Sequence, residues 1–105
     1  MENFSNFGDI LNLTLKGEWF NMIASDEKKE EYREIKSYWD TRLENREYDT
    51  VKFRWGYSSD APTVWVECKG IQKGGRGNPD WGWSGKCYII KLGKILKFEN
   101  YDKKI

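Results

Sequence analysis

Residues 26–33 read Asp-Glu-Lys-Lys-Glu-Glu-Tyr-Arg and place acidic and basic side chains side by side. If this segment is a strand, alternation puts Glu31 and Arg33 on one face as a fixed acid–base pair, and Lys28 on the other. A guanidinium in such a pair can hold a phosphate or a base edge through its forked donors. A lysine in a dry pocket can act as a base or a nucleophile. The alternative is a solvated helix face, on which the pairs Lys29–Arg33 and Glu27–Glu31 would repel.

The chain contains no histidine, which excludes Ser-His-Asp and Cys-His catalysis and any zinc site with a histidine ligand. Two cysteines, Cys68 and Cys87, cannot form a four-thiolate site, so no metal and no cofactor is expected. Both cysteines lie in alternating apolar segments and are predicted to be buried free thiols. Catalysis would therefore depend on Lys, Asp, Glu, Tyr, Ser or Thr, unless the protein only binds.

Length and charge narrow the class of protein further. The 105 residues predict a single domain over 1–105, and the net charge of +1 argues against nonspecific polyanion binding. A local basic surface is still expected, because residues 69–91 hold five bases and one acid. The start of the chain lacks signal-peptide features, and no apolar run approaches the roughly 18 residues of a membrane span. These features predict a cytoplasmic protein without membrane contact, most simply a monomer.

The hydropathy pattern predicts the elements that must position these side chains. Alternation of apolar and polar residues indicates strands at 10–15, 48–55, 62–68 and 87–92. Helical spacing indicates short helices at 18–24 and 37–46, whereas 28–35 fits either a helix or a strand. Residues 74–85 contain five glycines and one proline and form a long loop. We therefore predict an α+β fold, a small β-barrel of about five to six mostly antiparallel strands with two short helices packed outside.

Aromatic residues are abundant, with 6 Trp, 6 Tyr and 5 Phe. Trp81 and Trp83 lie in the glycine-rich loop, where burial of both in a core is difficult, so a role in stacking on bases is a reasonable hypothesis. The alternative is that large aromatic rings fill the interior of a small barrel. Trp19 and Trp39 have the spacing of core residues and are predicted to belong to the core.

Residues 10–97 resemble an ASCH domain, a member of the PUA-like superfamily. The run ILNLTLKGEWFNMIASDEKKEEYREIKSYWDTRL and the later segments YDTVKFRWGY, PTVWVECKGI, NPDWGW and CYIIKLGKIL carry the similarity. The family pattern Gly-x-Lys-x-x-Glu-x-Arg falls on Asp26, Lys28, Glu31 and Arg33. Asp26 replaces the glycine, and aspartate tolerates a left-handed turn better than most residues.

The resemblance implies a PUA-like barrel with a cleft between barrel and helices, and a function linked to RNA. We predict that the cleft binds RNA or a modified nucleoside through the motif and through basic and aromatic residues around it. The predicted ligand-binding residues are Lys16, Lys28, Glu31, Arg33, Arg54, Trp55, Tyr57, Arg76, Trp81 and Trp83.

Two other functions stay open. Some ASCH proteins hydrolyse the amide of 4-acetylcytidine with a Lys–Thr–Glu set and others are described as ribonucleases, which suggests a hydrolase using Lys28 with Glu31 or Asp80; Glu67 is a further candidate acid. Glu31 stands where the amidohydrolases have threonine, so their nucleophile is absent here. The third hypothesis is a phage or mobile-element accessory protein or inhibitor that binds a host protein, since exposed tryptophans suit protein interfaces.

Overall fold

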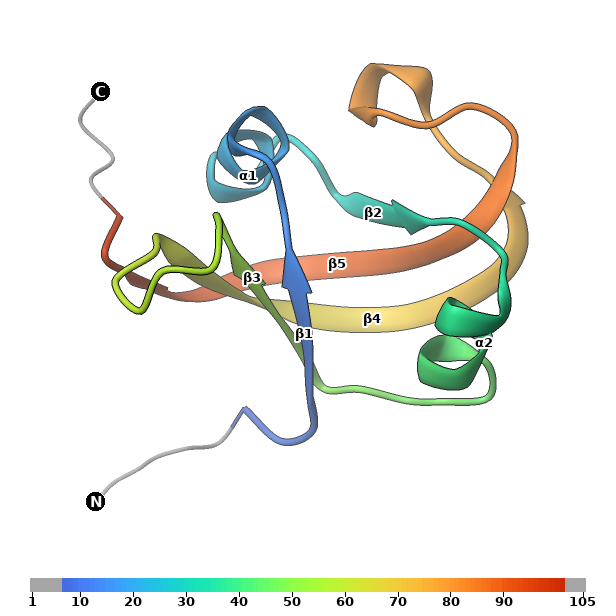
Figure 1. The fold of residues 1–105 in the computed structure, drawn as a ribbon, viewed down its shortest axis with the longest axis horizontal. Coiled ribbons are helices and arrows are strands. Elements are labelled where there is room, and N and C mark those ends of the chain that lie inside the picture. Colours follow the sequence, from blue (N-terminus) through green and yellow to red (C-terminus); the bar gives the residue numbers. More distant parts are fainter. Residues whose placement is uncertain (1–6, 102–105) are drawn as a thin grey trace.

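The computed structural model describes residues 7–101, which form one five-stranded sheet and two short α-helices (Figure 1). The elements in chain order are β1 (Ile10–Thr14), α1 (Gly17–Ala24), β2 (Glu30–Arg33), α2 (Ser37–Leu43), β3 (Thr50–Arg54), β4 (Thr63–Arg76), the 3₁₀ helix η1 (Pro79–Trp81) and β5 (Lys86–Glu99). The predicted α+β class and the two short helices are confirmed.

The strand order across the sheet is β1-β3-β4-β5-β2. Only β1 and β3 are parallel, and the other three neighbouring pairs are antiparallel, as predicted for most of the sheet. In the part of the chain that the structure describes, β1 and β2 are the two edges and no backbone ladder joins them. The sheet is therefore mixed and is not closed by strand pairing.

β4 and β5 are the main departure from the predicted elements, because each is 14 residues long. Their register shifts at several points between Trp65 and Gly75, and Gly70 and Gly74 have positive φ angles. Each bulge inserts a residue and interrupts the alternation of faces, which hides the strand from a period-two pattern. The ambiguous segment 28–35 contains strand β2, and α2 ends at Leu43 rather than at position 46.

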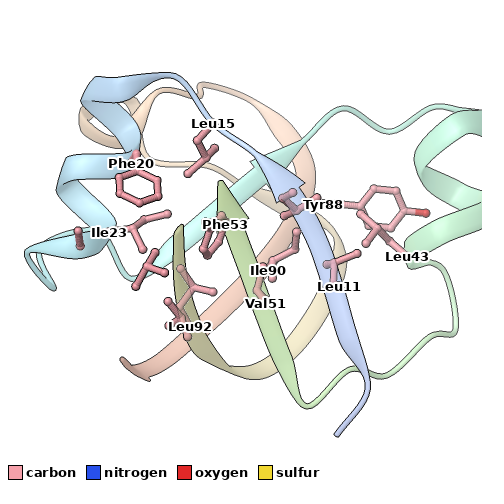
Figure 2. Packing of buried hydrophobic residues seen from close by; sticks show 14 residues of the cluster. Leu11, Leu15, Phe20, Ile23, Leu43, Val51, Phe53, Tyr88, Ile90 and Leu92 are labelled. Atoms are coloured by element: carbon pink, nitrogen blue, oxygen red, sulfur yellow. The ribbon is translucent and has the colours of Figure 1, made fainter. Parts of the chain in front are cut away.

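The core lies between the concave sheet and the two helices (Figure 2). Phe20 and Ile23 of α1, Leu43 of α2 and Phe53 of β3 are each at most 1% exposed. Trp19 and Trp39 pack against this core, as predicted, although both stay partly exposed.

The two cysteines are free thiols, as predicted, although only Cys87 is fully buried and Cys68 is partly exposed. Burial raises the pKa of both thiols, which favours the protonated form. No helix within residues 7–101 is long and apolar enough to cross a membrane.

A polar cluster fastens α2 to the β4–β5 hairpin. The Tyr88 hydroxyl donates to Asp40, and the Lys73 ammonium lies 3.2 Å from the same carboxylate and 3.0 Å from Glu44. The hydrogen bond from Tyr88, supported by the one from Lys73, lowers the pKa of the Asp40 carboxyl below its ordinary value.

The lowered pKa of Asp40 predicts an acid-dependent loss of stability. A carboxyl whose folded pKa is depressed stabilises the fold fully above its unfolded value, here 3.8, and loses that contribution as the pH falls toward the folded value. We expect urea midpoints measured from pH 5 to pH 2 to fall, and the Asp40→Asn variant to show a flatter profile below about pH 4. Parallel profiles for the two proteins would contradict this assignment.

Candidate functional site

A tight turn between α1 and β2 positions the predicted motif. Asp26 has a φ of 70°, so it occupies the left-handed conformation that was expected to survive the replacement of glycine. The backbone N–H groups of Glu27 and Lys28 donate to the Met22 carbonyl at 3.0 and 2.9 Å. These bonds fold the chain back on the end of α1 and place Lys28 two residues before β2.

Lys28, Glu31 and Arg33 form a buried charged cluster. The Lys28 Nζ lies 2.7 Å from Glu31 Oε1, while Arg33 donates to Glu31 Oε2 from Nη2 at 2.8 Å and from Nε at 3.1 Å. The predicted Glu31–Arg33 pair is confirmed. Lys28 was expected on the opposite face, but it precedes the first residue of β2, so strand alternation does not apply to it.

The charged cluster contains two basic side chains, Lys28 and Arg33, and one carboxylate, Glu31. Lys28 and Glu31 are 2% and 6% exposed, and Lys28 also donates to the Glu30 carbonyl at 2.6 Å. Both oxygens of Glu31 accept from cations, so one negative charge is shared between two positive charges. Charge-assisted bonds in a buried setting are short and directional, so the cluster is held in one geometry.

Arg33 is the member of the charged cluster that reaches the surface, with 18% of its side chain exposed. Its Nη2 also donates to the Thr14 carbonyl at 3.3 Å, and its guanidinium lies 5.0 Å from the centre of the Trp39 ring. Arg33 therefore connects edge strand β2 to edge strand β1. Its Nη1 has no hydrogen-bond partner among the residues that the structure describes, which leaves a charged donor for a ligand.

A cavity of about 270 Å³ opens over the charged cluster, and we call it the tryptophan cavity. Its walls come from the end of β1, the β1–α1 connection, α1, β2 and the loop at 77–85. Its lining residues are Thr14, Leu15, Lys16, Trp19, Glu31, Tyr32, Arg33, Trp81, Gly82 and Trp83.

Aromatic residues line the tryptophan cavity together with Glu31 and Arg33. Trp81 and Trp83 pack against the buried residues Tyr32, Cys87 and Ile89. Gly82 has a φ of 100°, and a Cβ at that position would lie 2.9 Å from the Trp19 ring, so only glycine fits there.

The Tyr32 hydroxyl is held in place at the base of the aromatic side. It donates to Glu30 Oε1 at 2.6 Å. Burial, reinforced by this bond, raises the pKa of Tyr32 far above its ordinary value, so the ring stays neutral at physiological pH. The cavity thus combines neutral aromatic surfaces with a positively charged side.

The structure brings together half of the predicted ligand-binding residues. Those lining the tryptophan cavity are Lys16, Glu31, Arg33, Trp81 and Trp83. Lys28 lies behind them, bonded to Glu31, and does not line the cavity.

The other predicted residues lie elsewhere. Arg54 donates to the Ser58 carbonyl, Trp55 and Tyr57 follow β3 on the surface, and Arg76 is exposed at the end of β4. Asp80 is exposed in η1, and neither it nor Glu67 is among the residues that line the cavity.

Sequence reasoning missed Thr14, Leu15, Trp19, Tyr32 and Gly82 as lining residues. Trp19 has the helical spacing of a core residue, and its position under the loop depends on a contact with Gly82, more than sixty positions away. The sequence contained a signal for Tyr32, because this residue lies between Glu31 and Arg33 of the motif.

A larger hollow of about 680 Å³ lies between the α2–β3 connection and β4. Its lining residues are Leu43, Asn45, Arg46, Glu47, Tyr48, Cys68, Lys69, Gly70 and Ile71. None of the predicted site residues lines this hollow. We therefore do not take it as the candidate site, although its volume is larger than that of the tryptophan cavity. No group of metal-ligating side chains occurs within residues 7–101.

The fold and the site together define an α+β protein with a buried Lys–Glu–Arg cluster next to a tryptophan cavity. No protein-family model matches the chain, and no match is found among curated proteins or among solved structures. The ASCH resemblance therefore stays a prediction, and the function has to be argued from the site.

Proposed function

We propose that the tryptophan cavity binds a nucleobase, in a modified nucleoside or at one position of an RNA strand, as the ASCH resemblance implies. The observation that carries this proposal is that the Arg33 guanidinium, whose Nη1 has no hydrogen-bond partner among the described residues, lines the same cavity as Trp19, Trp81 and Trp83. Planar rings favour a flat aromatic ligand, and a fixed guanidinium favours a carbonyl edge or a phosphate.

The size and charge of the cavity favour a small ligand unit. A volume of about 270 Å³ lies just below the usual range of small-molecule pockets, about 300–1,000 Å³. Such a space suits one base with its sugar rather than a duplex. The exposed ammonium of Lys16 at the rim is suited to a phosphate.

We also propose that the sheet is an open form of the PUA-like barrel. The bond from Arg33 to the Thr14 carbonyl supports this view, because it joins the two edge strands by a side chain where no ladder joins them. In this arrangement the ligand would bind where the barrel is not closed by backbone pairing.

The hydrolase hypothesis receives less support from the geometry. Lys28 donates to Glu31 and to the Glu30 carbonyl, and it does not line the cavity. A nucleophilic or basic lysine must reach the substrate directly. Asp80 is exposed and is not a lining residue, so no second acid faces the cavity beside Glu31.

Substitutions in the cavity should weaken the binding of nucleosides. We expect Trp81→Ala to weaken binding by roughly 5- to 150-fold, the range that follows from about 1–3 kcal/mol of stacking per base. Arg33→Lys keeps the charge but loses the forked donors, and we expect a loss of about tenfold or more. Calorimetric titration with cytidine, 4-acetylcytidine and a single-stranded RNA tetranucleotide measures both effects.

Arg46→Ala is the matched control, because Arg46 is an exposed arginine outside the tryptophan cavity. It should bind all three probes as the wild type does. Near-ultraviolet circular dichroism checks that each variant keeps its tryptophan packing. Equal affinity of wild type, Trp81→Ala and Arg33→Lys, or the absence of binding by the wild type, would refute the proposed function.

A further inference from the structure

Two aromatic side chains immediately after β3 are exposed. Trp55 is 42% exposed and Tyr57 is 87% exposed, although large aromatic rings are usually buried in a small fold. Neither residue lines the tryptophan cavity. In Figure 1, α1 lies between the turn after β3 and the loop at 77–85.

Trp55 is held at a defined position against the start of α1. A Cβ on Gly17 would lie 2.4 Å from the Trp55 ring, so the glycine backbone packs directly on the indole. On another side the Phe20 ring lies 5.9 Å away, centre to centre. These two contacts orient the indole and leave part of it open to solvent.

One residue separates Trp55 from the tryptophan cavity. Gly17 contacts the indole, and its neighbour Lys16 lines the cavity. Consecutive Cα atoms are about 3.8 Å apart, so the residue that contacts Trp55 and the residue that lines the cavity are neighbours on the backbone. Lys16 is exposed.

We infer that Trp55 is a second stacking subsite for single-stranded RNA, which holds the base next to the one in the tryptophan cavity. This inference rests on the proposed function. Lys16 would neutralise the phosphate that links the two nucleotides, because it lines the cavity and directly precedes Gly17, which contacts Trp55. Tyr57, two residues beyond Trp55, is available to the following base.

The tryptophan cavity, Lys16 and Trp55 together indicate the length of the ligand, which the cavity alone does not. A free nucleoside would occupy only the tryptophan cavity, whereas an oligonucleotide would also contact Lys16 and Trp55. Alternating basic and aromatic groups along a surface are the usual means of binding a single strand without reading its sequence. The preferred ligand is therefore an RNA strand of at least two nucleotides.

The test compares adenosine monophosphate, the dinucleotide ApA and oligoadenylate of four nucleotides. Two variants of one position provide the contrast: Trp55→Leu keeps an apolar contact with Gly17 and Phe20 but has no aromatic face, and Trp55→Phe keeps a ring. We expect the wild type to bind ApA about tenfold more tightly than the monophosphate, as one stacked base predicts. Trp55→Leu should lose this gain, Trp55→Phe should retain most of it, and all three proteins should bind the monophosphate equally.

Each outcome decides between the two proposals. Binding of the monophosphate with no gain for ApA, or a gain that survives in Trp55→Leu, overturns the second subsite and leaves the proposed function intact. No binding of any probe by the wild type overturns both. If Trp55→Leu does not fold, Tyr57→Ala replaces it, because Tyr57 is 87% exposed, and the expected result is a loss of affinity for the tetranucleotide alone.

Discussion

Replacement of Glu31 by alanine is expected to lower the free energy of unfolding by about 3–5 kcal/mol. The reason is that Lys28, 2% exposed, would lose its carboxylate partner while it lies beside the positive charge of Arg33. Desolvation of an unpaired ammonium is costly, and its remaining acceptor is the Glu30 carbonyl. Urea denaturation followed by tryptophan fluorescence measures the change.

Lys29→Ala is the matched control for the Glu31 variant. The Lys29–Asp26 pair comes from the same turn, but its side chains are 40% and 62% exposed. An exposed ion pair contributes at most about 1 kcal/mol, and the bond from the Lys29 ammonium to the Gly93 carbonyl at 2.9 Å contributes about 1 kcal/mol more. Lys29→Ala should therefore lose at most about 2 kcal/mol, less than Glu31→Ala. Equal destabilisation by Glu31→Ala and Lys29→Ala would show that the buried cluster has no special energetic role.

The double variant Lys28→Met, Glu31→Leu tests why Glu31→Ala is unstable. It distinguishes the cost of leaving Lys28 unpaired from the loss of a stabilising Lys28–Glu31 ion pair. Apolar residues of similar size can replace a buried ion pair at little cost, because the desolvation penalties of Lys28 and Glu31 disappear together. Arg33, 18% exposed, loses its carboxylate in both this variant and Glu31→Ala, so the comparison isolates Lys28. We expect the double variant to be more stable than Glu31→Ala despite carrying two changes. A result equal to or below Glu31→Ala would mean that the ion pair itself stabilises the fold.

Phe20→Ala is expected to lower the free energy of unfolding by about 3–5 kcal/mol, the usual cost of removing a buried aromatic ring. Phe20 is fully buried in α1, and its ring lies 5.9 Å from Trp55 and 5.4 Å from Tyr101. The helix has eight residues, so it depends on packing rather than on its own hydrogen bonds. Thermal and urea denaturation should both detect the loss.

Leu96→Ala is the control for Phe20→Ala, because Leu96 is 38% exposed near the end of β5. Substitutions at such surface positions usually change stability by less than about 0.5 kcal/mol. Phe20→Leu should lie between the two, since leucine fills part of the space. A Phe20→Ala protein as stable as Leu96→Ala would mean that α1 does not depend on the core.

Much of the site could be inferred from residue types and local spacing. Glu31 and Arg33 are two positions apart, so any strand over 28–35 places them side by side, and the hydrogen-bonded pair in the structure confirms this. Trp81 and Trp83 lie in a glycine-rich segment, where burial of both in a core is difficult, and both line the cavity. Trp55 and Tyr57 were expected at the same site, but they lie beyond Lys16 and Gly17.

Local reasoning was insufficient where a position depends on distant contacts. Lys28 joins Glu31 because the turn at Asp26 changes its direction before β2 begins, which strand alternation cannot anticipate. The full lengths of β4 and β5 depend on bulges that interrupt the alternation of faces. Asp80 is a plausible acid by type, but its place in η1 leaves it exposed to solvent.

The sequence by itself determined the chemistry that is available: no histidine, a Lys–Glu–Arg motif, and a surplus of tryptophan in one loop. These properties follow from residue types and short spacings, which folding does not change. Only the tertiary structure decided which of these groups meet. The Arg33–Thr14 bond and the Gly82–Trp19 contact join segments that are far apart in the chain, and such contacts exist only after the sheet has curved and the loop has packed against α1.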